Sequence, residues 1–193
     1  MILRGKKVVL REKRLDDAYQ DYLWRTDEEL ARLDAAQPLT TRFSSYKAFY
    51  ADELQFPQPH KYKFAIDNLQ GRHIGNCMYY DLDPYEGQAE VGIMIGDKEY
   101  WGQGYGAEAV TLLVRHLFNV EGLRTVYLHT LEWNHRAQRS FEKCGFMARD
   151  RVRREGKTFV LMELSRARWE RFPIAVGGQA EDSRRSTVGE PRV

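Results

Sequence analysis

The chain has 193 residues, which suits one domain, and 42% of them are apolar, enough to fill one substantial core. Its 30 basic and 28 acidic residues nearly balance, so the strongly basic face of a protein that binds nucleic acid in bulk is not expected. The chain has two cysteines, no apolar run near the roughly 20 residues of a membrane span, and no secretory signal core after Met1. We therefore expect a reduced, soluble, cytoplasmic protein with no membrane attachment.

The N-terminal third predicts one strand and two helices. Residues 7–11 alternate and contain β-branched valines, which favours a strand. Residues 16–32 gather apolar side chains on one side of a helix, and residues 44–54 predict a second helix. Pro57 and Pro59 end that helix, because proline lacks a backbone donor and disfavours helical geometry in the residue before it.

The middle of the chain changes from strands to a long helix. Three strands are predicted at residues 62–67, 73–81 and 89–95, with turn-forming residues between them. Apolar side chains then recur with helical spacing over residues 104–120.

The C-terminal part predicts a strand over residues 123–131, a helix over 135–143 and a hairpin over 146–164. The sequence becomes polar and charged after Phe172, so we expect one domain over residues 1–172 and a disordered tail over 173–193. The order of elements predicts an α/β fold, in which helices flank a mixed, mostly antiparallel central sheet.

A glycine-rich turn precedes the long helix, where residues 101–107 read Trp-Gly-Gln-Gly-Tyr-Gly-Ala. The first backbone N–H groups of a helix have no internal partner and lie at the positive end of its dipole, so they bind phosphate well. Glycine lets the backbone approach such a ligand closely. The pattern Gly102-x-Gly104-x-x-Ala107 also satisfies the dinucleotide fingerprint, but six residues separate it from the strand that ends at Ile95. A glycine-rich helix start without any ligand is the alternative.

A second motif follows the next strand, where residues 134–146 read Asn-His-Arg-Ala-Gln-Arg-Ser-Phe-Glu-Lys-Cys-Gly-Phe. Together with residues 101–107, this motif resembles the GCN5-related N-acetyltransferase (GNAT) superfamily. The nearer likeness is to the branch of ribosomal-protein alanine and polyamine N-acetyltransferases. The resemblance covers nearly the whole chain except the tail, and it implies a splayed pair of strands at the cofactor site.

The resemblance also implies positions for acetyl-CoA. The backbone of Ile93, Met94 and Ile95 would pair with the pantetheine arm. The pyrophosphate would lie on the turn formed by Trp101, Gly102, Gln103, Gly104, Tyr105, Gly106 and Ala107. Asn134 would bond the pantetheine and Phe141 would lie against it. Ile93 and Ile95 are equally suited to a core, and Asn134 is equally suited to capping the following helix.

The chemistry implied by the family is direct attack of an amine on the thioester, for which a base must take a proton from the amine. Glu90 is our leading candidate for the base, and Asp81 and Asp83 are alternatives. Many family members have a tyrosine where this chain has Phe141, which cannot donate a proton. Ser140 is a weaker candidate for that role.

Cysteine and histidine are two further residue types that can carry chemistry. Cys144 invites a covalent acyl-enzyme, but packing is the better interpretation because no histidine supports it in sequence. The histidines are too scattered to suggest a metal site.

The sequence therefore predicts an acetyl-CoA-dependent N-acetyltransferase without a metal, acting on a small-molecule amine or a protein N-terminus. A non-catalytic acyl-CoA-binding or regulatory module is the main alternative, supported by Phe141, and a nucleotide-binding protein built on the glycines alone is a third. A homodimer is compatible with the sequence, which leaves the oligomeric state open.

Overall fold

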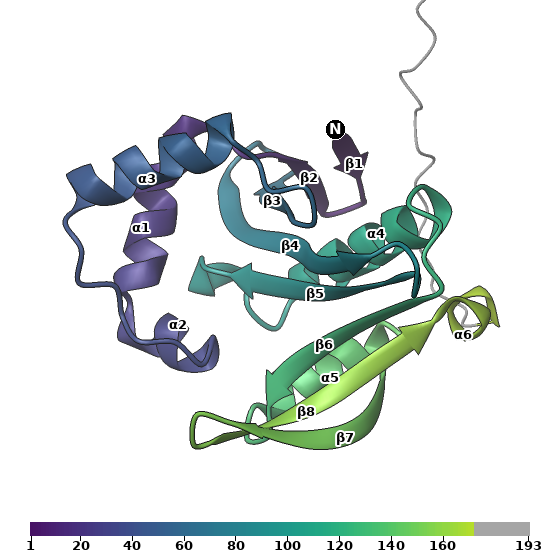
Figure 1. The fold of residues 1–193 in the computed structure, drawn as a ribbon. Helices are drawn as coiled ribbons and strands as arrows, with labels where there is room; N and C mark the ends of the chain where they lie inside the picture. The colour runs from purple at the N-terminus through teal and green to yellow at the C-terminus, as the bar shows by residue number, and fades with distance from the viewer. Residues whose placement is uncertain (172–193) are drawn as a thin grey trace, which may run out of the picture.

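An eight-stranded sheet forms the centre of the protein over residues 1–171, the part of the chain that the computed structural model describes (Figure 1). Its strands lie in the order β1-β2-β3-β4-β5-β6-β8-β7. The strands are β1 (Ile2–Arg4), β2 (Val8–Glu12), β3 (Tyr62–Asn68), β4 (His73–Asp83), β5 (Gln88–Ile95), β6 (Thr125–Leu131), β7 (Met147–Arg154) and β8 (Lys157–Ser165). The helices are α1 (Ala18–Thr26), α2 (Glu28–Leu33), α3 (Phe43–Gln55), α4 (Tyr105–Asn119), α5 (His135–Lys143) and α6 (Arg166–Arg171), with short 3₁₀ turns at Leu15–Asp17 and Lys98–Tyr100.

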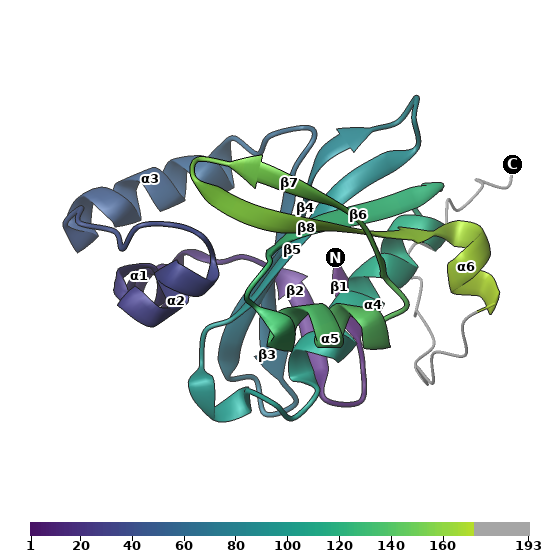
Figure 2. The ribbon, with the colours of Figure 1, turned by 90° about the horizontal axis from the view of Figure 1, so that it is seen from below.

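Neighbouring strands run antiparallel except for β5 and β6, which are parallel. Parallel neighbours need a crossover, and α4 provides it. The prediction of a mixed, mostly antiparallel sheet flanked by helices is confirmed. Figure 1 shows α4 and α5 behind the sheet, and Figure 2 shows them side by side, with α1, α2 and α3 grouped away from them.

The main core lies between α4 and the sheet. Val110, Leu113 and Leu117 of α4 are almost fully buried, as the helical spacing predicted. They pack in one cluster with Ala89 and Val91 of β5. Because side chains alternate along a strand, Glu90 points to the opposite face of the sheet, away from α4.

Buried polar contacts attach α1 to that opposite face. The carboxylate of Asp21 accepts hydrogen bonds from Asn76 at 2.8 Å and from the Tyr50 hydroxyl at 3.0 Å. It also lies 2.7 Å from Lys13 Nζ and 3.0 Å from His73 Nε2. Buried charges are stable only when they are paired in this way.

Several predicted bounds needed correction. The predicted helix over 16–32 is two helices, because Asp27 adopts an extended conformation and its side chain caps α2 by accepting from Leu30 N–H at 2.9 Å. The strand β1 and the helix α6 were not predicted. Phe172 and the proposed tail over residues 173–193 lie outside the described residues.

Within residues 1–171, no helix has the length and apolar character needed to cross a membrane. The same residues contain no group of three or more His, Cys, Asp or Glu side chains placed to hold a metal ion.

Candidate active site

The two parallel strands at the centre of the sheet stay together only briefly. They pair at Gln88↔Thr125, Ala89↔Val126 and Glu90↔Tyr127. Beyond Glu90 the strands diverge, as Figure 1 shows, although β5 continues to Ile95 and β6 to Leu131. This is the splayed strand pair that the family resemblance implied, and Glu90 lies at the point where the strands separate.

The glycine-rich turn opens α4 as predicted. Gly102 and Gly104 have φ angles of 73° and 86°, a left-handed conformation that favours glycine, and Gly104 is the N-cap of α4. A Cβ on Gly102 would have no atom within 4 Å, and one on Gly104 would have only Lys7 Nζ, at 3.8 Å. The backbone at the positive end of α4 is therefore open to a ligand, which fits a pyrophosphate.

Side chains of the turn hold it in place. Trp101 Nε1–H donates to the Ile95 carbonyl oxygen at 2.7 Å, and the amide of Gln103 donates to the Glu99 carbonyl. The guanidinium of Arg136 lies 3.9 Å from the centre of the Trp101 ring, which links the turn to α5. These side chains have structural partners, which leaves ligand binding to the peptide groups of the turn.

The remaining residues of the turn contact the protein too. The Tyr105 ring meets the Tyr100 ring edge-on, with centres 4.8 Å apart. Gly106 lies against β5, since a Cβ there would be 3.4 Å from Ile95 and 3.8 Å from Ile93. The carbonyl of Ala107 accepts from Thr111 Oγ1 at 2.8 Å, as helix side chains often do.

The second motif forms α5 with the predicted bounds. Asn134 is its N-cap, and its Oδ1 accepts from Ala137 N–H at 3.2 Å. Phe141 is half-buried against the core, and its ring centre lies 6.0 Å from that of Phe146. Ser140 is also half-buried on α5. The capping role of Asn134 is therefore observed, while its role toward the cofactor stays a prediction.

A row of side chains crosses the sheet on the face away from α4. Glu90 pairs across the strands with Tyr80 of β4 and with Tyr127 of β6. Glu90 is only 6% exposed, so it is not an ordinary solvated strand residue. A carboxylate buried beside the opening between two strands is a candidate for proton transfer.

His129 is the direct partner of Glu90, with Nδ1 at 2.8 Å from Oε1. Its other ring nitrogen, Nε2, lies 3.3 Å from Arg154 Nη2. Because arginine can only donate, we assign the tautomer in which Nε2 accepts and Nδ1–H donates to Glu90. Sequence reasoning missed His129 as a partner. The parallel register is the signal that would have found it, since it puts His129 two residues beyond Tyr127 on the same face.

The charge of Glu90 affects its neighbours. Burial raises the pKa of Tyr80 and of Tyr127, and the negative charge of Glu90 raises both further. Both phenols therefore stay protonated and neutral at physiological pH. They surround Glu90 with hydrogen-bonding groups that carry no competing charge.

The other candidate bases differ from Glu90 in their surroundings. Asp83 accepts from the backbone N–H groups of Tyr85 and Glu86, both at 2.9 Å, so it stabilises a turn. Asp81 is exposed and has a φ of 50°. Of the three carboxylates, Glu90 is the buried one where β5 and β6 separate.

Both cysteines are free and buried. Burial raises the pKa of the Cys144 thiol to about 11, against a smaller opposite effect of Thr111, and burial also raises the pKa of Cys77. The thiol of Cys144 donates to the Ala107 carbonyl at 3.4 Å. These contacts agree with packing as the role of Cys144.

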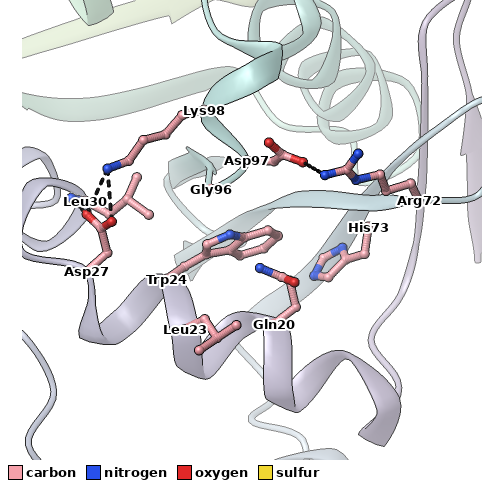
Figure 3. Close-up of a pocket in the computed structure, with 10 residues that line it drawn as sticks. All are labelled: Gln20, Leu23, Trp24, Asp27, Leu30, Arg72, His73, Gly96, Asp97 and Lys98. Atoms are coloured by element: carbon pink, nitrogen blue, oxygen red, sulfur yellow. Dashed lines mark hydrogen bonds and ion pairs between the residues drawn. The ribbon is translucent and has the colours of Figure 1, made fainter.

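A cavity of about 520 Å³ lies between α1, the start of α2 and the segment that follows β5 (Figure 3). The indole of Trp24 lies against Gly96, where a Cβ would be 2.1 Å from the ring. Two ion pairs border the cavity, Lys98 with Asp27 at 2.9 Å and Arg72 with Asp97 at 2.6 Å. The cavity adjoins the segment that leads from β5 to the glycine turn.

Comparisons with known proteins agree with this geometry. Residues 7–147 match the model of the acetyltransferase (GNAT) domain family. A probable spermine N(1)-acetyltransferase from Bacillus subtilis subsp. natto is 28% identical over 110 residues, which cover 54% of this chain and 72% of the relative.

Two solved structures show the same fold. The spermidine N-acetyltransferase from Vibrio cholerae in complex with CoA and spermine superposes with a TM-score of 0.75 at 17% identity, covering 84% of this chain and 98% of that one. An aminoglycoside acetyltransferase in complex with coenzyme A gives a TM-score of 0.70 at 23% identity, covering 85% and 98% of the two chains.

The splayed strands, the open glycine turn and the match over residues 7–147 lead to one conclusion. The chain belongs to the GNAT acetyltransferase family and is an N-acyltransferase that uses acetyl-CoA as its co-substrate.

Proposed function

We propose that this protein transfers the acetyl group of acetyl-CoA to a primary amine of a small molecule by direct attack, with Glu90 as the general base. The observation that carries the proposal is the buried contact of Glu90 with His129, 2.8 Å long, at the point where β5 and β6 separate. A buried carboxylate at this position favours proton transfer over a non-catalytic module.

Acetyl-CoA would supply the activated thioester carbonyl. The peptide N–H groups of residues 102–107 would hold its pyrophosphate at the positive end of α4. The backbone of Ile93, Met94 and Ile95 would pair with the pantetheine arm, because this part of β5 has no partner on β6. Asn134 would use its amide N–H groups, since its Oδ1 already caps α5.

Proton transfer is assigned to Glu90. An alkyl amine has a pKa near 10 and is mostly protonated at neutral pH, so a base must free its lone pair. The Nδ1–H of His129 donates to Oε1 and orients the carboxylate, and the Tyr80 hydroxyl is a second hydrogen-bond partner of Glu90. A thiolate leaving group with a pKa of about 8.5 needs little help from an acid. Ser140, beside Phe141, remains the candidate donor for that minor step.

The acceptor is proposed to be small because α2 bridges the segment after β5 and the segment after β6 on the face of the sheet that carries Glu90. At one end Asp27 pairs with Lys98 beyond β5, and at the other Arg32 stacks 4.8 Å from the centre of the Trp133 ring beyond β6. A folded protein would have to displace α2, whereas a flexible amine would not. Spermine, spermidine and aminoglycosides, named for the similar proteins, are amines of that kind.

The test is release of free thiol from acetyl-CoA across an amine panel. The panel should contain spermine, spermidine, an aminoglycoside and a short peptide with a free N-terminus. We expect turnover with at least one small amine and little with the peptide. Binding of CoA without turnover of any amine would instead support a non-catalytic module. Preference for the peptide would shift the acceptor to a protein N-terminus.

A further inference from the structure

The turn between β1 and β2 lies against the first turn of α4. Glu108 of α4 accepts hydrogen bonds from the backbone N–H groups of Lys6 at 2.5 Å and Lys7 at 2.7 Å. Gly5 makes room for this contact, because a Cβ there would lie 2.8 Å from a Glu108 oxygen. The far N-terminal segment is thus fixed beside the glycine-rich turn, about 100 positions away in sequence.

The fixed turn places the side chain of Lys7 at the glycines. Its Nζ donates to the Gln103 carbonyl at 2.7 Å and lies 3.8 Å from the space that a Cβ on Gly104 would occupy. It also lies 5.5 Å from the centre of the Tyr105 ring, at the start of α4. Lys7 therefore puts an ammonium group next to the N-terminus of this helix.

That position is electrostatically unfavourable for a cation on its own. The N-terminus of a helix carries positive partial charge, so cations are favoured at the other end. Glu108 offsets part of this charge, but its two oxygens are used by the backbone of Lys6 and Lys7. An anion seated on the turn would be attracted by the ammonium and by the helix N–H groups together.

We propose that Lys7 is a ligand of the coenzyme's pyrophosphate, supplied from outside the glycine-rich turn, and that Glu108 positions it. The inference deepens the proposed function, since it rests on the placement of the pyrophosphate at residues 102–107. On binding, the ammonium turns from the Gln103 carbonyl toward the phosphate oxygens. Because Lys7 Nζ already lies 3.8 Å from the open position beside Gly104, this requires only a rotation about the lysine side chain.

The test compares Lys7→Gln with Lys6→Gln. The two variants lose the same charge in the same exposed turn, and both keep the backbone N–H groups that Glu108 accepts. Binding of CoA and of 3′-dephospho-CoA is measured by titration calorimetry at low and moderate salt, without any acceptor. Loss of one charge-assisted hydrogen bond to phosphate should weaken binding of both coenzymes about tenfold in Lys7→Gln. Lys6→Gln should stay within about twofold of the unaltered protein, and Lys7→Arg should recover most of the affinity.

Three outcomes would overturn the assignment. They are unchanged affinity in Lys7→Gln, an equal loss in Lys6→Gln, and a loss that disappears with 3′-dephospho-CoA, which would place Lys7 at the 3′-phosphate. A thermal unfolding scan of the ligand-free variants shows whether the fold is kept. Because the assay reads coenzyme binding alone, its result stands apart from whether any amine is acetylated.

Discussion

Replacement of Glu90 by glutamine separates the charge of this side chain from its shape. The amide is the same size, and its oxygen can still accept Nδ1–H from His129 across the 2.8 Å contact. The stability cost is the difference between a charge-assisted and a neutral hydrogen bond, about 1 kcal/mol. Turnover should fall far more, because loss of a general base costs about 10²- to 10⁴-fold, or about 3 to 5 kcal/mol in the barrier.

The assay is kcat and KM for the best amine across pH, together with CoA affinity by calorimetry. CoA affinity should not change, and the deficit of Glu90→Gln should shrink toward pH 10, where the amine is free without a base. Glu163→Gln is the matched control, because Glu163 pairs with Tyr127 in the same row but bonds Arg149. A Glu90→Gln rate within threefold of the unaltered enzyme, or an equal fall in the control, would refute the assignment of the base.

Three other predictions follow from the geometry. Gly104→Ala forces a side chain into a φ of 86°, which costs about 1 to 2 kcal/mol of stability. We expect urea titration to show a folded protein and calorimetry to show a CoA affinity at least tenfold lower. Unchanged affinity would refute the assignment of the glycine-rich turn as the phosphate site. Cys144→Ala should keep its turnover, because a pKa of about 11 leaves about one thiolate in ten thousand at pH 7, and loss of turnover would revive a covalent mechanism. Burial alone would raise the pKa of Asp21, but its contacts with His73, Lys13 and Asn76 outweigh burial and lower it. The stability that Asp21 contributes is therefore present above its unfolded pKa of about 3.9 and is lost as the pH falls below that value. Asp21→Asn should flatten this acid dependence in urea unfolding and cost about 3 kcal/mol at pH 7, because the buried Lys13 loses its nearest carboxylate. A parallel acid dependence would contradict this.

Elements with strong local signals were predicted from sequence alone. The helix α5 has its predicted bounds, since Asn134 caps its start and Gly145 adopts a φ of 95° after its end. The break between α1 and α2 was not predicted, because Asp27 is compatible with a helix interior. Its extended conformation depends on capping Leu30 and on pairing with Lys98, a contact over 71 positions.

The candidate site divides in the same way. The glycine-rich helix start was predictable because a positive φ is a local property of the backbone that glycine adopts readily. The contact between His129 and Glu90 was not predictable from local sequence. It depends on the register of two parallel strands that α4 separates in sequence. The contact of Lys7 with the turn is not predictable for the same reason, since its neighbour Gln103 is 96 positions away.

The short pairing of β5 with β6 has a thermodynamic consequence. Three residue pairs join the two halves of the sheet there, whereas β4 and β5 pair along most of their length. A ligand that binds between the diverging strands binds the folded chain and not the unfolded one. Its binding therefore raises the free energy of unfolding by mass action. At a hundred times its Kd, acetyl-CoA would contribute about 2.7 kcal/mol, and at a thousand times about 4.1 kcal/mol. The equilibrium stability of the folded enzyme would then follow the supply of its own co-substrate.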